Sequence, residues 1–429
     1  MPTATPSAPS ASVYRHPGFL PFLASRLMAV FAMQIQAVVV AWQVYDMTRD
    51  PLSLAYVGLA QFIPMLLLLM PAGDLIDRYD RKRILRASWT LQALCSAALL
   101  WLSLSGGAVH GIYAVLVFYG CARAFTGPTL QSLLPQIVPR ERLAQAIAAN
   151  SMIMRGATIS GPLLGGGLYA LGGGSLTFAL CLVCFVGGVL LLTFVPVRYA
   201  EQMQKPEGSA WGRFTAGIRF VRSRPIILGT ISLDLFAVLL GGVVALLPIY
   251  AHEVLKVGPA GLGALRSAMA IGEVSVGFYL SLKPFDRRVG LTMFAAVAVF
   301  GLANLVFALS DLFWLSFAAL LVAGGADMVS MYIRSSLVQF STPDAMRGRV
   351  NAVNMLFIGS SNELGEFRAG SSAAWLGAVP AAVLGSLCTL GVVGGWMWGF
   401  KTLRRVDRFE DASPAPGAAA AQARESVAA

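Results

Sequence analysis

The sequence predicts an all-α membrane protein whose twelve transmembrane helices form two pseudo-symmetric six-helix bundles. Three observations support this fold class: twelve long apolar runs, an alternation of basic and nearly charge-free gaps between them, and a repeat that relates the two halves of the chain. Hydrophobic residues make up 57% of the chain and charged residues only 12%, whereas soluble domains average about a quarter charged residues. Most side chains are therefore expected to face lipid or a neighbouring helix.

Runs of about 18 or more apolar residues predict membrane-spanning helices. We expect these helices near residues 19–44, 53–73, 84–104, 111–134, 143–170, 175–196, 226–250, 259–282, 290–309, 312–334, 348–372 and 376–400. The domains that follow are a disordered tail at 1–18, bundles at 19–196 and 226–400, a linker at 197–225 and a second tail at 401–429. An amphipathic helix on the membrane surface is expected within the linker, at Trp211–Val221.

The basic residues predict the topology. When the N-terminus is placed in the cytoplasm, 24 of the 32 Lys and Arg residues fall in cytoplasmic segments, and only Arg49 and Lys256 fall in outer loops. This is the distribution that the positive-inside rule requires. Both termini are therefore predicted to be cytoplasmic, in a cell membrane, which is the inner membrane if the source is a Gram-negative bacterium. The net charge of +11 is explained by contacts with anionic lipid headgroups, so no nucleic-acid partner is expected.

Other function classes lack the residues they need. All five cysteines lie within predicted helices, and the CxxC pair Cys181 and Cys184 has no second ligand pair nearby, so neither a disulfide framework nor a metal site is expected. The three histidines stand near helix ends or in a tail, without catalytic or metal-ligand spacing around them. A phosphate-binding Gly-rich Lys loop is absent from the sequence. We therefore expect no enzyme, no cofactor and no direct coupling to ATP.

An internal repeat divides the chain. A shift of 204 positions places Gly73 on Gly277 and Gly161 on Gly365, and it carries the first six predicted helices onto the last six in the same orientation. Such parallel repeats are typical of transporters built from two related bundles.

The loop after the second predicted helix carries a known signature. It reads Gly73-Asp74-Leu75-Ile76-Asp77-Arg78-Tyr79-Asp80-Arg81-Lys82-Arg83. It resembles the Gly-x-Leu-x-Asp-Arg-x-Gly-Arg-Lys signature of the major facilitator superfamily, and departs from it at Asp80, where the family usually has Gly. With the twelve helices, the basic linker and the repeat, the resemblance covers nearly the whole chain. It implies a secondary active transporter, with a small-molecule substrate and protons as partners, working as a monomer in the bilayer.

The resemblance implies a gate on the cytoplasmic side. Asp77 is expected to pair with a cation of the other half, namely Arg347 or Arg349 at the start of the eleventh helix, when that side closes. Gly73 is expected to let the second helix approach a neighbour closely. Arg81 belongs to the same gate, unless it serves only as a topology anchor.

The fifth predicted helix contains a Gly-Pro element. The run Gly161-Pro162-Leu163-Leu164-Gly165-Gly166 is similar to the Gly-Pro-x-x-Gly-Gly element of the superfamily's exporters. Pro162 is expected to kink the helix, and Gly161, Gly165 and Gly166 to allow close helix packing, so these four are further gating candidates. A structural kink needs no export function, and the second repeat has Glu366 at the position of Pro162.

Charges inside the predicted helices differ between the halves. An ionisable residue at mid-membrane costs at least about 2.5 kcal/mol on insertion scales, so a function is expected for those that persist. The first half has arginines there and the second half mainly acids. This predicts a central cavity with a basic wall and an acidic wall; the alternative is a set of buried ion pairs that lock helices together.

The polar residues inside the predicted helices are candidates for two roles, proton coupling and substrate binding. Arg123 begins Arg-Ala-Phe-Thr-Gly, which is similar to a span-4 element with a proton-linked role in the superfamily. The proton-coupling candidates are Arg123, Asp234, Glu273, Asp327, Glu363 and Glu366. The substrate-binding candidates are Arg26, Gln34, Gln36, Gln61, Arg123 and Arg155.

Two longer stretches, 232–242 and 362–370, resemble the subgroup of enterobactin exporters and drug–proton antiporters. The resemblance implies proton-coupled export of a siderophore-like or amphipathic small molecule. Arginines suit an anionic, aromatic cargo such as a catecholate, whereas cationic drugs suit the acidic wall. An importer (symporter) of a small organic solute on the same fold is the main alternative, and a sensor without transport is another.

Overall fold

The computed structural model describes residues 13–197 and 210–412, which form helices and turns without a strand. The helices are α1 (Phe19–Thr48), α2 (Pro51–Arg78), α3 (Arg81–Ser105), α4 (Val109–Ile137), α5 (Leu143–Thr193), α6 (Ala210–Ser223), α7 (Pro225–Gly241), α8 (Leu247–Ile249), α9 (Gly258–Leu282), α10 (Val289–Leu309), α11 (Phe313–Phe340), α12 (Asp344–Leu376), α13 (Ala378–Gly399) and α14 (Lys401–Arg404). The short elements are η1 (Val13–Arg15), η2 (Arg140–Arg142), η4 (Val244–Leu246), the π-helical η5 (Tyr250–Val254) and η6 (Phe409–Ala412).

The helices account for the twelve predicted spans. Nine stretches of the described chain are long and apolar enough to cross a membrane. One of them is α5, which holds two predicted spans because Gly172 and Gly173 break its helical geometry, Gly173 with φ 65°. Another runs from Pro225 to Val254 through α7, η4, α8 and η5. The eighth and eleventh spans are α9 and α12, which carry charged residues along their length. The predicted all-helical fold is confirmed.

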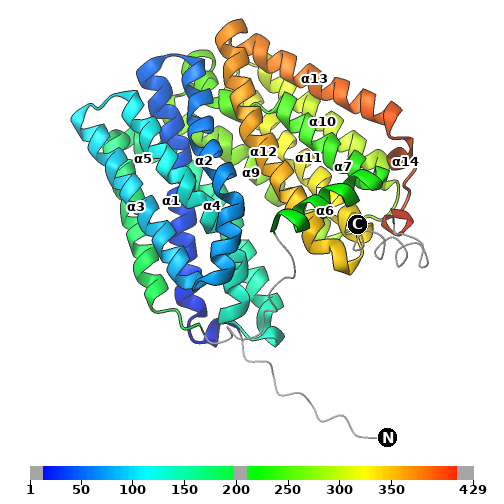
Figure 1. Cartoon of the computed structure of the whole chain (residues 1–429). Helices are drawn as coiled ribbons and strands as arrows, with labels where there is room; N and C mark the ends of the chain where they lie inside the picture. The colour runs from blue at the N-terminus through cyan, green and yellow to red at the C-terminus, as the bar shows by residue number, and fades with distance from the viewer. Residues whose placement is uncertain (1–12, 198–209, 413–429) are drawn as a thin grey trace, which may run out of the picture.

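The helices form two bundles, α1–α5 and α7–α13, with α6 between them in the chain. Figure 1 shows the bundles leaning together at one end and diverging at the other, where α1 begins. We call the diverging end, which holds Phe19 and Gly399, the inner end after the predicted topology, and the opposite end the outer end. Between the bundles, α5 packs along α9 and α2 packs along α12.

Hydrophobic packing explains why the outer end is closed. One buried cluster lies entirely within the first bundle, and three lie within the second bundle and α6. A fifth cluster contains residues of both bundles, including Val38 and Leu54 from the first and Leu246, Tyr250 and Leu262 from the second. Apolar surface removed from water stabilises a contact by about 25 cal/mol per Å². The outer ends therefore share one core, which the inner ends lack.

An amphipathic helix lies in the predicted linker. On α6, Phe220 and Val221 are buried against Val350 and Val353 of α12, whereas Trp211 is exposed. Only one residue separates the end of α6 from the start of α7, which holds α6 at the inner end of the second bundle. The linker residues 198–209 lie outside the described part of the chain.

Parts of both predicted tails pack on the bundles. Val13 is 2% exposed and belongs to the first bundle's core, and Phe409 contacts the rings of Phe285, Tyr332 and Phe340. These apolar side chains reach cores that open toward the inner end, so residues 13–18 and 401–412 belong structurally to the bundles. Residues 1–12 and 413–429, predicted as tails, lie outside the described residues.

Candidate functional site

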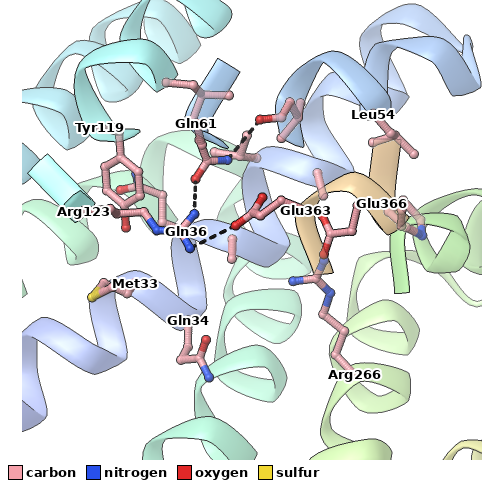
Figure 2. Close-up of a pocket in the computed structure, with 17 residues that line it drawn as sticks. Met33, Gln34, Gln36, Leu54, Gln61, Tyr119, Arg123, Arg266, Glu363 and Glu366 are labelled. Carbon is pink, nitrogen blue, oxygen red and sulfur yellow. Dashed lines mark hydrogen bonds and ion pairs between the residues drawn. The ribbon is translucent and has the colours of Figure 1, made fainter. Parts of the chain in front are cut away.

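A cavity of about 200 Å³ lies between the two bundles. Polar side chains from both bundles point into it, as Figure 2 shows. Its lining is Met33, Gln34, Gln36, Ala37, Val40, Ala41, Leu54, Val57, Gln61, Leu116, Tyr119, Arg123, Ala245, Pro248, Arg266, Glu363 and Glu366. The lining therefore combines apolar side chains with a small set of amides, arginines and glutamates, as small-molecule sites usually do.

An ion pair crosses the cavity from one bundle to the other. Arg123 of α4 places Nη2 3.1 Å from Oε1 of Glu363 on α12, and its Nη1 donates to Oε1 of Gln61 at 3.2 Å. Figure 2 shows both contacts. Gln61 is oriented because its Nε2 donates to the Val57 carbonyl at 3.2 Å. Gly120 brings α4 close enough, since a Cβ there would lie 2.3 Å from the Gln61 carbonyl oxygen.

A second arginine and glutamate face each other on the other wall. Arg266 of α9 points toward Glu366 of α12 (Figure 2), and the two charges attract. The Nε atom of Arg266 is buried and has no hydrogen-bond partner among the described residues. Sequence reasoning did not assign Arg266 to the site, although an arginine inside an apolar run was a signal. It lies in the second half, where acids outnumber arginines and which is therefore expected to supply the acidic wall.

Four of the six predicted substrate-binding residues line the cavity: Gln34, Gln36, Gln61 and Arg123. Gln36 is only 2% exposed and accepts a hydrogen bond from Ser96 Oγ at 2.7 Å, so it is held by its own bundle. Arg26 and Arg155 are not part of the lining.

The remaining predicted proton-coupling residues lie outside the cavity. Arg155 of α5 places Nη1 3.8 Å from Oε2 of Glu273 on α9, which is a second ion pair between the bundles. Asp327 interacts electrostatically with Glu273. Asp234 forms a buried ion pair with Arg334 inside the second bundle. The structure thus divides the predicted set into a cavity group, a seam group and one internal pair, and their roles stay predictions.

The seam between α5 and α9 is built on glycine. A Cβ at Gly166 would lie 2.3 Å from the Pro259 carbonyl oxygen, and one at Gly263 would lie 2.4 Å from the Pro162 carbonyl oxygen. Ser267 Oγ donates to the Ile159 carbonyl at 2.7 Å. The backbones of the two bundles therefore touch directly along this seam.

The other candidates of the Gly-Pro element face α1. A Cβ at Gly161 would lie 2.6 Å from the Gln34 side chain, and one at Gly165 would lie 3.2 Å from the Ile35 backbone. Pro162 keeps helical backbone angles, and the break in α5 comes later, at Gly172 and Gly173.

Gly73, one member of the predicted inner gate, stands apart from the neighbouring helices in this conformation. Among the described residues, no atom of another helix lies within 4 Å of a Cβ at Gly73, so they do not form the close helix contact predicted there, because the inner ends diverge. Arg81 Nη1 donates to the Ser132 carbonyl at 3.4 Å within its own bundle.

The partners of Asp77 stay a prediction. Its side chain lies outside the described part of the structure. On α12, Arg347 is exposed, and Arg349 Nη1 contacts Met346 Sδ at 3.5 Å.

Polar contacts close the outer end, and we call this cluster the outer latch. Tyr45 of α1 donates from its hydroxyl to Oε1 of Glu253. Arg49, at the end of α1, contacts Nδ1 of His252 at 2.7 Å and pairs with Asp46 at 2.7 Å. His252 and Glu253 belong to the π-helical η5. Sequence reasoning missed the latch, because no pattern links residues about 200 positions apart.

Comparisons with known proteins agree with this geometry. A family model described as transmembrane secretion effector matches residues 8–423. Among named relatives, the enterobactin exporters EntS of Citrobacter koseri and of Shigella dysenteriae serotype 1 are each 26% identical to the chain, over 79% of it and 81% of their own lengths.

Solved structures share the fold. A bacterial homologue of the iron transporter ferroportin, in an inward-facing state, superposes with a TM-score of 0.70 at 18% identity, covering 92% of this chain and 100% of that one. A POT family transporter in complex with 5-aminolevulinic acid gives a TM-score of 0.72 at 11% identity, covering 92% and 98%. The chain is a multi-pass membrane transporter, not an enzyme, and it belongs to the transmembrane secretion effector family of the major facilitator superfamily.

Proposed function

We propose that the protein exports a siderophore-like or other amphipathic small molecule from the cytoplasm in exchange for protons. The Arg123–Glu363 pair carries this proposal, because its members sit on different bundles inside the cavity. When the bundles move, the carboxylate changes its partner, and an opposite charge nearby decides how readily a carboxylate binds a proton. Proton binding by Glu363 is thus tied to the side on which the cavity opens.

Export is favoured over import by two features. The relatives that match most of the chain are named enterobactin exporters, and α5 carries the Gly-Pro element that resembles the superfamily's exporters. An importer on the same fold is the rival. Because one chain forms the whole cavity, we propose the monomer as the working unit, in a cell membrane with both termini in the cytoplasm.

The direction of proton movement separates the two functions. Purified protein is placed in liposomes with a pH-sensitive dye trapped inside, and catechol-bearing and drug-like cargoes are added on one side. Exchange predicts that protons leave the liposome as cargo enters; symport predicts that both enter together.

Two variants test the assigned acids in the same assay, and a third serves as their control. Glu363→Gln and Glu366→Gln are expected to lower cargo-driven proton movement at least about tenfold, with normal protein amounts, because each removes a proton site. Asp286→Asn is the control, since Asp286 is exposed in the loop before α10. Unchanged proton movement in both Gln variants contradicts the proposal.

A further inference from the structure

The formal charges of the cavity cancel. Two arginines, Arg123 and Arg266, and two glutamates, Glu363 and Glu366, belong to the lining, and every other lining residue is neutral. The two-wall arrangement predicted from the sequence therefore does not describe the cavity, because the second bundle supplies an arginine as well as the acids.

Each guanidinium in the cavity already faces a carboxylate. Arg123 is bound by Glu363 and Gln61, and Arg266 faces Glu366 (Figure 2). An anionic cargo that binds either guanidinium lies beside the carboxylate that already faces it, and the two like charges repel each other. The arginines are therefore poor receptors for an anion.

The glutamates have free acceptor capacity. A carboxylate has about four lone-pair sites. Glu363 uses one of its oxygens for Arg123, and Glu366 accepts no hydrogen bond from the described residues. A cargo with N–H or O–H donors reaches these oxygens without breaking either ion pair, while its apolar part contacts Met33, Leu54 and Val57.

Proton coupling points to the same class of cargo. When Glu363 and Glu366 bind protons, their negative charge is lost and the cavity becomes positive. A positive cavity holds an anion more tightly, so an anion and protons would travel together. Exchange requires the opposite, a cargo that protons displace, and donors on carboxylate oxygens meet that requirement because a proton occupies the same atoms.

We propose that the cargo carries no net negative charge and donates hydrogen bonds to Glu363 and Glu366. This inference rests on the proposed proton exchange, and it names the chemical class of the cargo: a neutral or cationic amphipathic molecule rich in hydrogen-bond donors. The cavity of about 200 Å³ is below the range of about 300–1,000 Å³ for drug-sized ligands, so it matches one aromatic headgroup of such a molecule.

Three probes with one fluorophore test the charge class. Dansylamide is neutral, dansylcadaverine is cationic and dansylglycine is anionic, and the emission of each reports transfer from water to an apolar site. With purified protein in lipid nanodiscs, dansylglycine is expected to bind at least about tenfold more weakly than the other two, since charges a few ångströms apart interact strongly at an effective dielectric of about 20. Equal or tighter binding of dansylglycine overturns the proposal.

Two variants change the cavity charge in opposite directions. Glu366→Gln makes the cavity positive and is expected to strengthen dansylglycine binding about tenfold, whereas Arg266→Gln makes it negative and strengthens dansylcadaverine binding by a similar factor. An unchanged unfolding temperature shows that each variant is folded, and Asp286→Asn is the control for charge outside the cavity.

The proposal is overturned if both variants change the relative affinities for dansylglycine and dansylcadaverine in the same direction. These readings are binding constants and do not depend on flux. Failure of proton exchange in the liposome assay is therefore distinguishable from a wrong charge class.

Discussion

The two seams between the bundles occupy equivalent positions in the repeat but are built from different chemistry. A shift of 204 positions carries the first half of α5 onto α12, and α2 onto α9. In the α5–α9 seam, Gly166 and Gly263 bring one backbone against the other. In the α2–α12 seam, Gly370 touches Ala55 at the outer end, and then Glu366 follows beside Gly58 and borders the cavity.

This difference teaches how a repeated architecture divides its tasks. Pro162 in the first repeat corresponds to Glu366 in the second, so the same helical position supplies close packing on one side and a charge on the other. We infer that the glycine seam acts as the pivot between the bundles, and that the charged seam binds cargo and protons.

The largest effect is expected at the glycine seam. Gly166→Ala places a methyl group 2.3 Å from a carbonyl oxygen of α9, whereas Gly167→Ala, one residue further, meets no atom within 4 Å. Overpacking of this kind costs about 1–3 kcal/mol or more, so Gly166→Ala is expected to lower the unfolding temperature and abolish flux. Thermal unfolding and liposome flux measure both. Equal behaviour of the two variants means that the seam is not tightly packed.

The next effect concerns the pair that crosses the cavity. Arg123→Gln leaves Glu363 without its cation; because the two side chains are 29% and 14% exposed, we expect a loss of about 2 kcal/mol, below the about 3–5 kcal/mol of a fully buried pair. Arg123→Lys keeps the charge and is expected to retain part of the flux.

The double variant Arg123→Gln with Glu363→Gln separates stability from coupling. It leaves no unpaired charge, so the unfolding temperature is expected to recover while proton-driven flux stays absent. Recovery of flux along with stability shows that the pair is only structural.

Much of the fold follows from the sequence because insertion in lipid depends on local composition. The predicted span at 290–309 and the helix α10 (Val289–Leu309) differ by one residue. The site is less predictable, because its partners come from distant segments. The sequence showed that Arg123 and Glu363 cost energy in the membrane, but not that they meet. Arg266 was visible as a buried charge, yet only packing places it beside Glu366.

A moderate effect is expected at the outer latch. Tyr45→Phe removes the hydroxyl that binds Glu253, at a net cost of about 1 kcal/mol, which shifts the balance toward an open outer end about fivefold. Tyr113→Phe is the matched control, because its hydroxyl donates to Ser53 within one bundle. Spin labels at Ser105 and Asp311, on the outer ends of different bundles, report the distance. An unchanged distance distribution in Tyr45→Phe shows that the outer latch does not hold the outer end closed.

The smallest effect on stability is expected at the inner gate. Gly73→Ala meets no atom of another described helix within 4 Å, so the free energy of unfolding is expected to stay within about ±0.5 kcal/mol of the original protein, as is typical of open sites. Flux is nevertheless expected to fall, if the predicted close contact forms when the inner ends meet. Normal flux in this variant shows that α2 never approaches a neighbour at Gly73.

The central claim is that the cavity on the charged seam opens alternately to the two sides of the membrane. The direct measurement places one cysteine in its lining, Val57→Cys, in a chain whose five native cysteines are replaced by alanine. A membrane-impermeant thiol reagent is then applied from either side, with and without a pH gradient. The account predicts labelling from the inner side at rest and from the outer side when protons are supplied there. Labelling from the inner side alone under every condition contradicts it.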